Sequence, residues 1–150
     1  DDELLYETAR RGRVDEVRGL LDAGVPPDKF MAYDGSTAMV IAARSGHGAT
    51  VQLLLERRAS LDIHTDDGSG PLLHAASGGC PQVTAALIEA KGDPSEENED
   101  GLTPLLLAAQ RGSLDVARLL VEARADVNTQ VEDWGTPLAV AEEAGHKEVA

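Results

Sequence analysis

The sequence predicts an all-α solenoid in which short helix-turn-helix units stack side by side and are joined by β-hairpin turns. Three columns of residues repeat at steps of 33 or 34 residues: an Asp-Gly turn, a Thr-Pro helix start and a glycine between two helical segments. A repeat of this length accommodates one turn and two short helices. Such a unit cannot bury its apolar face alone, so its stability depends on its neighbours.

The Asp-Gly column marks the hairpin turns. It contains three dipeptides 33 residues apart, Asp34-Gly35, Asp67-Gly68 and Asp100-Gly101, and Asp133 continues it. Glycine favours such turns because it adopts positive φ without steric cost. In the last copy Trp134 replaces the turn glycine and Gly135 follows it, so we expect a remodelled hairpin there.

The first helix of each unit begins at the Thr-Pro column. The expected N-cap is threonine in three units, at Thr37, Thr103 and Thr136. The first helical position is proline in three units, at Pro71, Pro104 and Pro137. Proline is tolerated there because its missing N–H would have no partner in the helix. Paired alanines in the helix body allow close packing. The glycine column then ends the helix, at Gly12, Gly46, Gly79, Gly112 and Gly145.

The second helix of each unit carries an apolar pair on its inward face, and a turn follows it. The pairs are Leu20-Leu21, Leu54-Leu55, Leu87-Ile88 and Leu120-Val121, and each fully buried side chain contributes roughly 1.5–3 kcal/mol. The turn column reads Gly24, Arg58, Lys91 and Arg124. Because the three basic residues recur at a step of 33, we expect them to form a ladder along one edge of the solenoid. The ladder either complements helix C-termini or provides a basic ridge for a partner.

Composition narrows the range of functions. The 150 residues carry 13 Lys and Arg against 27 Asp and Glu, a formal charge of −14, which argues against nucleic acid and anionic membranes as partners. Aromatic residues make up only 3%, so the core must be aliphatic. A single cysteine, Cys80, excludes an internal disulfide and fits a reducing intracellular compartment rather than secretion. No apolar run approaches the roughly 20 residues of a membrane span.

The sequence contains no motif for catalysis, a cofactor or a metal. It lacks a P-loop lysine, a nucleophile elbow and a zinc-binding His-Glu-x-x-His helix. His47 and His146 fall in one column about three units apart, too far to share a metal, and His74 is better interpreted as a packing residue than as a base. The acidic stretch 93–100 lacks the ligand spacing of a calcium loop. We therefore expect a protein that is not an enzyme.

At the level of whole units the sequence resembles the ankyrin repeat family. The segment 100–112, Asp-Gly-Leu-Thr-Pro-Leu-Leu-Leu-Ala-Ala-Gln-Arg-Gly, is close to the family pattern, and so are Leu119-Leu120 and the segment 125–128, Ala-Asp-Val-Asn. The resemblance covers nearly the whole chain as one domain, 1–150, with units at about 1–32, 33–65, 66–98 and 99–131 and a partial unit at 132–150. The family histidine after Thr-Pro-Leu is absent, and His74 lies one position later, so the resemblance does not by itself imply the usual hydrogen bonds to the turn.

The resemblance implies that hairpin tips and the ends of the first helices line a concave, partner-binding face. The tips contain seven carboxylates, which we call the acidic tips, together with two aromatic residues and a leucine: Asp34, Asp66, Asp67, Glu99, Asp100, Glu132 and Asp133, then Tyr33, Trp134 and Leu102. The helix ends contribute four basic residues, which we call the palm arginines: Arg10, Arg11, Arg44 and Arg111. Tyr33 and Trp134 are candidate anchors at the two ends, because Tyr and Trp often dominate interfaces. Phe30 and Met31 either extend the first tip or pack on the N-terminal unit.

The resulting hypothesis is a non-enzymatic module that binds another protein of mixed surface charge through this concave face. In it the palm arginines meet acidic groups of the partner, and the acidic tips meet Lys or Arg. Two alternatives remain open at this stage: a scaffold subunit embedded in a larger assembly, and the recognition arm of a longer enzyme. The ladder residues Arg58, Lys91 and Arg124 form a second candidate surface.

Overall fold

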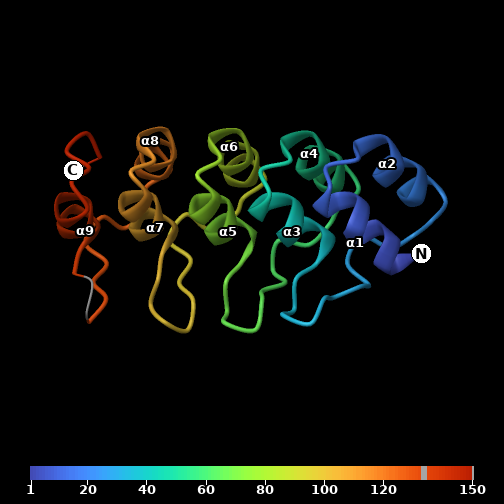
Figure 1. Ribbon diagram of the computed structural model, residues 1–150, viewed down its shortest axis with the longest axis horizontal. Coiled ribbons are helices and arrows are strands. Elements are labelled where there is room, and N and C mark those ends of the chain that lie inside the picture. Colours follow the sequence, from blue (N-terminus) through green and yellow to red (C-terminus); the bar gives the residue numbers. More distant parts are fainter. Residues whose placement is uncertain (133–134, 150) are drawn as a thin grey trace.

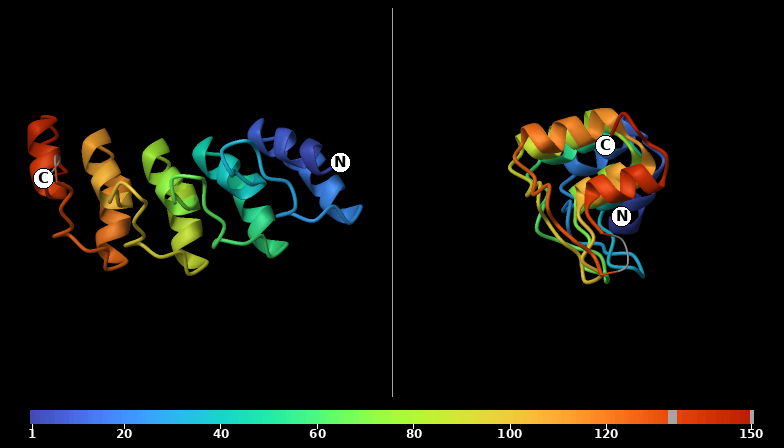
Figure 2. Two further views of the ribbon diagram at one scale, coloured as in Figure 1. Left: turned by 90° about the horizontal axis from the view of Figure 1, so that it is seen from below. Right: turned by 90° about the vertical axis from the view of Figure 1, so that its left-hand side faces the viewer.

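The computed structural model describes residues 1–132 and 135–149, and this part of the chain forms nine short helices. Their bounds are α1 (Asp2–Arg10), α2 (Val14–Asp22), α3 (Ala38–Arg44), α4 (Gly48–Glu56), α5 (Pro71–Gly78), α6 (Pro81–Glu89), α7 (Pro104–Arg111), α8 (Leu114–Glu122) and α9 (Pro137–Glu143). Odd-numbered helices form one row and even-numbered helices a second (Figure 1), and the hairpins project from one side of these rows (Figure 2). The predicted all-α solenoid is confirmed.

The Thr-Pro column starts helices as predicted. The hydroxyl oxygens of Thr37, Thr103 and Thr136 accept the N–H of the residue three positions later, at 3.4, 3.3 and 3.2 Å. Each bond satisfies one of the four N–H groups that a helix leaves free at its start. The third unit differs, because the N-cap of α5 is Gly70, which has no side chain to accept such a bond.

The glycine column ends the first helices in the left-handed conformation. Gly112, the C-cap of α7, has φ +76, and a Cβ added there would lie 2.5 Å from His146 Nδ1 of the next unit. The left-handed backbone favours glycine at this position, and the close approach of His146 leaves little room for a Cβ.

The core is aliphatic and runs along the stack. The paired alanines of α3, α5 and α7 are at most 1% exposed, and they let α3, α5 and α7 pack closely on one another. In α4, α6 and α8 the first residue of each predicted pair, Leu54, Leu87 and Leu120, is completely buried, while the second lies at the rim or is exposed. A smaller apolar cluster joins α7 to α9.

Backbone hydrogen bonds tie neighbouring hairpins together. The N–H of Asp66 donates to the Asp34 carbonyl at 2.9 Å, and the N–H of Glu99 donates to the Asp67 carbonyl at 2.9 Å. Within the turns, the carboxylates of Asp34 and Asp67 each accept the N–H two residues later at 3.0 Å. These bonds fix the distance between the tips of consecutive units. In the last unit Val131 and Gly135 form an antiparallel bridge.

The turn after each second helix has the left-handed conformation expected from the sequence. Gly24 has φ +88, and the three ladder residues have φ values of 60, 71 and 66: Arg58, Lys91 and Arg124. Each of these basic residues adopts a conformation that costs a non-glycine residue of order 1 kcal/mol.

Replacing Arg124 with glycine should raise the free energy of unfolding by about 0.5–1 kcal/mol, because glycine relieves the left-handed strain. Arg124 is exposed, so the change removes little packing. Chemical denaturation of the wild type and Arg124→Gly measures this difference. The control Arg124→Ala removes the same charge but keeps a Cβ; equal stabilisation by both variants would show that charge, not strain, is responsible.

Candidate functional site

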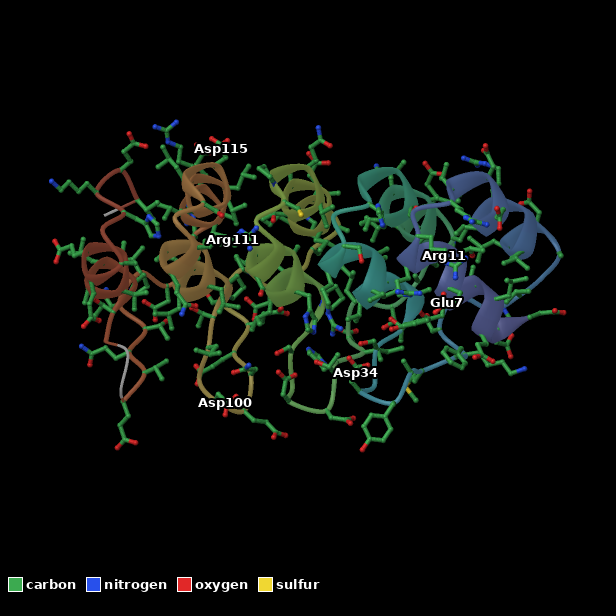
Figure 3. The ribbon with its side chains drawn as sticks, viewed as in Figure 1. Glu7, Arg11, Asp34, Asp100, Arg111 and Asp115 are labelled. Carbon is green, nitrogen blue, oxygen red and sulfur yellow. The ribbon has the colours of Figure 1, made fainter. Side chains whose placement is uncertain are left out.

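The acidic tips form a row along the ends of the hairpins. Asp100 lies at the far end of its hairpin, on the opposite side of the molecule from Asp115 of α8 (Figure 3). Five carboxylates of this row are exposed, and Asp34 is half-buried: Asp66, Asp67, Glu99, Asp100 and Glu132. Among the described residues, Asp34 alone of these six forms an ion pair. The predicted site residues Asp133 and Trp134 lie outside the described residues.

The palm arginines each have a partner within the chain. Arg10 and Arg11 both pair with Glu7, at 2.9 and 3.5 Å, and Figure 3 shows Glu7 and Arg11 together on the N-terminal unit. Arg111 Nη1 donates to the Ser77 carbonyl at 3.1 Å. Arg11 and Arg111 are far apart along the solenoid (Figure 3). The structure therefore does not gather these arginines into one free basic surface.

Arg44 belongs to a polar network that holds the second hairpin. Its Nη1 and Nη2 both donate to Asp34 Oδ2 at 3.2 Å, and Nη2 also donates to Ser36 Oγ at 3.2 Å. Hydrogen bonds from Ser36, followed by the contact with Arg44, lower the pKa of the Asp34 carboxyl. Asp34 is thus charged and neutralised internally, unlike the carboxylates of the later tips.

His74 extends this network into the third hairpin. Arg44 Nε donates to His74 Nδ1 at 3.4 Å, and His74 Nε2 lies 3.1 Å from Thr65 Oγ1. Thr65 Oγ1 in turn donates to Asp67 Oδ1 at 2.6 Å. The directions of these bonds assign the ring proton to Nε2. Burial, and then the positive charge of Arg44, lower the pKa of His74 to about 4, so the ring is neutral at pH 7.

This network was not found by sequence reasoning. His74 does bond the turn, although it stands one position after the family histidine, because its ring reaches Thr65 from the next position along the helix. Burial raises the pKa of Asp67, but hydrogen bonds from Thr65 and Ser69 outweigh it and lower that pKa overall. The fourth hairpin is held differently: Asn98 Oδ1 accepts the N–H of Asp100 and of Leu102, at 3.0 and 2.9 Å.

The tip of the second hairpin, which also carries Asp34, presents an exposed aromatic side chain. Tyr33 is completely exposed and Met31 is 57% exposed. Phe30 instead packs against Tyr6 of α1, with ring centroids 5.5 Å apart. Of the two interpretations of this segment, packing on the N-terminal unit therefore holds for Phe30, and Tyr33 and Met31 remain available at the surface.

The histidines and the cysteine are used in separate local contacts. His47 Nε2 lies 3.0 Å from the Arg10 carbonyl, and His146 Nε2 lies 3.1 Å from the Gln110 carbonyl, each bonding the preceding unit. The half-buried Cys80 Sγ donates to the Gly78 carbonyl at 3.5 Å. In residues 1–132 and 135–149 no three His, Cys, Asp or Glu side chains are grouped closely enough to hold a metal ion.

An apolar cavity of about 170 Å³ lies at the C-terminal end of the stack. It is lined by residues of α7, α8, α9 and the segments that follow α8 and α9: Leu105, Ala109, Ala117, Val121, Val127, Pro137, Leu138 and Val149. Three of these, Val121, Val127 and Leu138, are about half exposed. On α9 the side chain of Glu142 is exposed. Across the described ranges, no helix combines the length and the apolar character that crossing a membrane requires.

Comparison with known families agrees with this architecture. A profile described as ankyrin repeats, three copies, matches residues 72–150, and one described as ankyrin repeat matches residues 34–66. No curated protein is significantly similar to the chain. The two profile matches cover well over half of the chain and coincide with the hairpins and helix pairs described above. The chain therefore belongs to the ankyrin repeat family, whose members are generally modules that bind other proteins.

Proposed function

We propose that this protein binds a partner protein through its concave face, and that the acidic tips make the main electrostatic contact. The observation that carries this proposal is the contrast between the two charged sets. Asp66, Glu99, Asp100 and Glu132 are exposed without an ion pair among the described residues, whereas each palm arginine already has an internal partner. A surface of the partner rich in Lys and Arg fits this arrangement.

The charge of the protein is expected to make association with the partner fast and selective more than it raises the affinity. The net charge of −14 creates a negative field around the whole molecule, and the tips concentrate carboxylates at its edge. Complementary charges raise association rates and reject partners of the wrong sign. Tyr33 lies beside the row and offers the kind of exposed aromatic side chain that often anchors an interface. The palm arginines, still partly exposed, are secondary contacts in this proposal.

Reversing the charge of the free tips should weaken partner binding at least tenfold, or about 1.4 kcal/mol. The tip variant changes Asp66, Glu99, Asp100 and Glu132 to Lys and leaves Asp34 and Asp67, which hold their own hairpins, unchanged. Affinity capture from a native extract with mass spectrometry identifies the partner, and the dissociation constant of each variant is then measured against it.

Two matched variants control this experiment. One changes four exposed acidic residues of the second-helix row to Lys: Asp15, Glu56, Glu89 and Asp115. It carries the same change in net charge on the far side of the molecule and should bind almost normally. The other changes the palm arginines Arg10, Arg11 and Arg111 to Glu and leaves Arg44, which holds the second hairpin, unchanged. Equal losses in the tip and far-side variants would overturn the tip proposal, and a loss confined to the palm variant would move the site to the palm.

The apolar cavity at the C-terminal end favours a second candidate function, that of a scaffold subunit built into a larger assembly. The half-exposed valine and leucine side chains there form an apolar surface in contact with water. Burying this surface against another subunit would be favourable. Size measurement of the native complex distinguishes the two: a constant stoichiometric assembly supports the subunit, and a free monomer with amides protected through Glu148 contradicts it. An intracellular, reducing location is part of both proposals.

A further inference from the structure

The third unit lacks the side chain that caps the first helix in its neighbours. Threonine fills this column at Thr37, Thr103 and Thr136, and each hydroxyl accepts the N–H at the third helical position. Gly70 takes the place of threonine in the third unit and makes no side-chain bond. Its φ of −87 and ψ of 177 are extended values that threonine also adopts, so the backbone conformation does not require glycine here.

The carboxylate of Glu96 occupies the space that a threonine would fill. Glu96 Oε1 accepts the N–H of Leu73, the third helical residue of α5, at 2.6 Å. A Cβ added to Gly70 would lie 2.7 Å from Glu96 Oε2 and 3.0 Å from His64 Cδ2. Glu96 comes from the loop after α6, so the helix start of one unit is capped by the segment that leads into the next hairpin.

Two further hydrogen bonds join the segment that contains Glu96 to the third hairpin. Asn98 Nδ2 donates to Ser69 Oγ at 3.1 Å, and the N–H of Glu99 donates to the Asp67 carbonyl at 2.9 Å. The short segment 96–99 therefore holds the third hairpin and the start of α5 at three points. The Glu96 bond is the one of the three that involves a charged group, and charge-assisted bonds are the stronger kind.

Glu96 is half-buried, so its carboxylate depends on the hydrogen bond to α5 to compensate for lost hydration. The carboxylate is half-buried beside a cavity of about 240 Å³ whose lining includes Asp62, His64, Lys91 and Asp93. Burial raises the pKa of Glu96, and the hydrogen bond from Leu73 lowers it only in part. The positive end of α5 compensates a buried carboxylate that would otherwise be costly.

We propose that Glu96 is a latch between the start of α5 and the segment that leads into the fourth hairpin: it replaces the missing cap of α5 and thereby fixes the third hairpin against the fourth. Gly70 and Glu96 then act as a pair, because the absence of a side chain at position 70 makes room for the carboxylate. Glu96 is a positioning residue for the tips at Asp66 and Glu99.

Amide hydrogen exchange at Leu73 tests the latch directly. Glu96→Ala should speed exchange at this amide at least tenfold, because its acceptor is lost. Glu96→Gln keeps a side-chain oxygen and should retain most of the protection. The matched control is Glu97→Ala, which removes an exposed neighbouring carboxylate and should leave the Leu73 amide unchanged.

A double-mutant cycle tests whether Gly70 and Glu96 are coupled. Gly70→Thr supplies a hydroxyl cap, so adding Glu96→Ala to that variant should cause little further loss of protection at Leu73 or of stability in chemical denaturation. The same loss with and without Gly70→Thr would overturn the pairing. Unchanged Leu73 exchange in Glu96→Ala would overturn the latch itself.

Discussion

Replacing Leu54 with alanine should lower the free energy of unfolding by about 2–5 kcal/mol, the largest effect we expect from a single substitution. Leu54 is completely buried on α4, which packs against α2, α3 and α6. The substitution removes apolar contact on several sides at once. Since neighbouring units of a solenoid are stable only through their interfaces, the loss reaches beyond the second unit.

Chemical denaturation monitored by circular dichroism measures this loss. The control is Leu4→Ala, which truncates the same side chain at a position 51% exposed on α1 and should cost only a few tenths of a kcal/mol. Similar losses in the two variants would contradict the view that stability is concentrated in the buried seam between helices.

Stability should fall as the pH is lowered from about 6.5 to about 4, because the His74 network holds the ring neutral. The pKa of His74 is lowered from 6.5 to about 4 in the folded chain. Between these values the unfolded chain binds a proton at His74 that the folded chain does not, so acid favours unfolding. With allowance for solvent screening of a partly exposed ring, we expect a loss of roughly 1–2 kcal/mol over this interval.

Denaturation curves for the wild type and His74→Gln across this pH range isolate the contribution of the ring. The variant should be less stable at pH 7 but should lose less stability on acidification. Glu96 has the opposite effect on stability, because its raised pKa makes the folded chain bind a proton more readily than the unfolded chain. Since Glu96 is present in both proteins, its effect cancels in the comparison. Parallel pH profiles would contradict a role for His74.

The repeat pattern predicted the fold down to individual helix starts. Helices α5, α7 and α9 begin at Pro71, Pro104 and Pro137, the expected first helical positions. These positions could be predicted because proline and the preceding cap act locally, within one turn of helix. The same reasoning identified the left-handed conformation of the ladder residues.

The candidate site could be predicted only in part. The positions of the tips follow from the turn column, and the pairing of Arg10 with Glu7 has a spacing of three residues that a helix brings together. The contact between Arg44 and His74 spans 30 residues, and that between Arg111 and Ser77 spans 34. Contacts of this length depend on how units stack, which no local pattern in one unit reveals.

The hydrogen bonds between neighbouring hairpins give the tip carboxylates a regular, fixed spacing. Asp66 is bonded to the second hairpin and Glu99 to the third, so their spacing follows the stacking distance of the helices, about 8–10 Å. A polyproline II helix advances about 3.1 Å per residue and has three residues per turn, so every third side chain lies on the same face. Every third residue of such a helix laid along the row would thus come opposite a new carboxylate. The row would then select ligands by the spacing of their positive charges. A ligand whose charges were spaced one residue closer or further apart would not place each charge opposite a carboxylate.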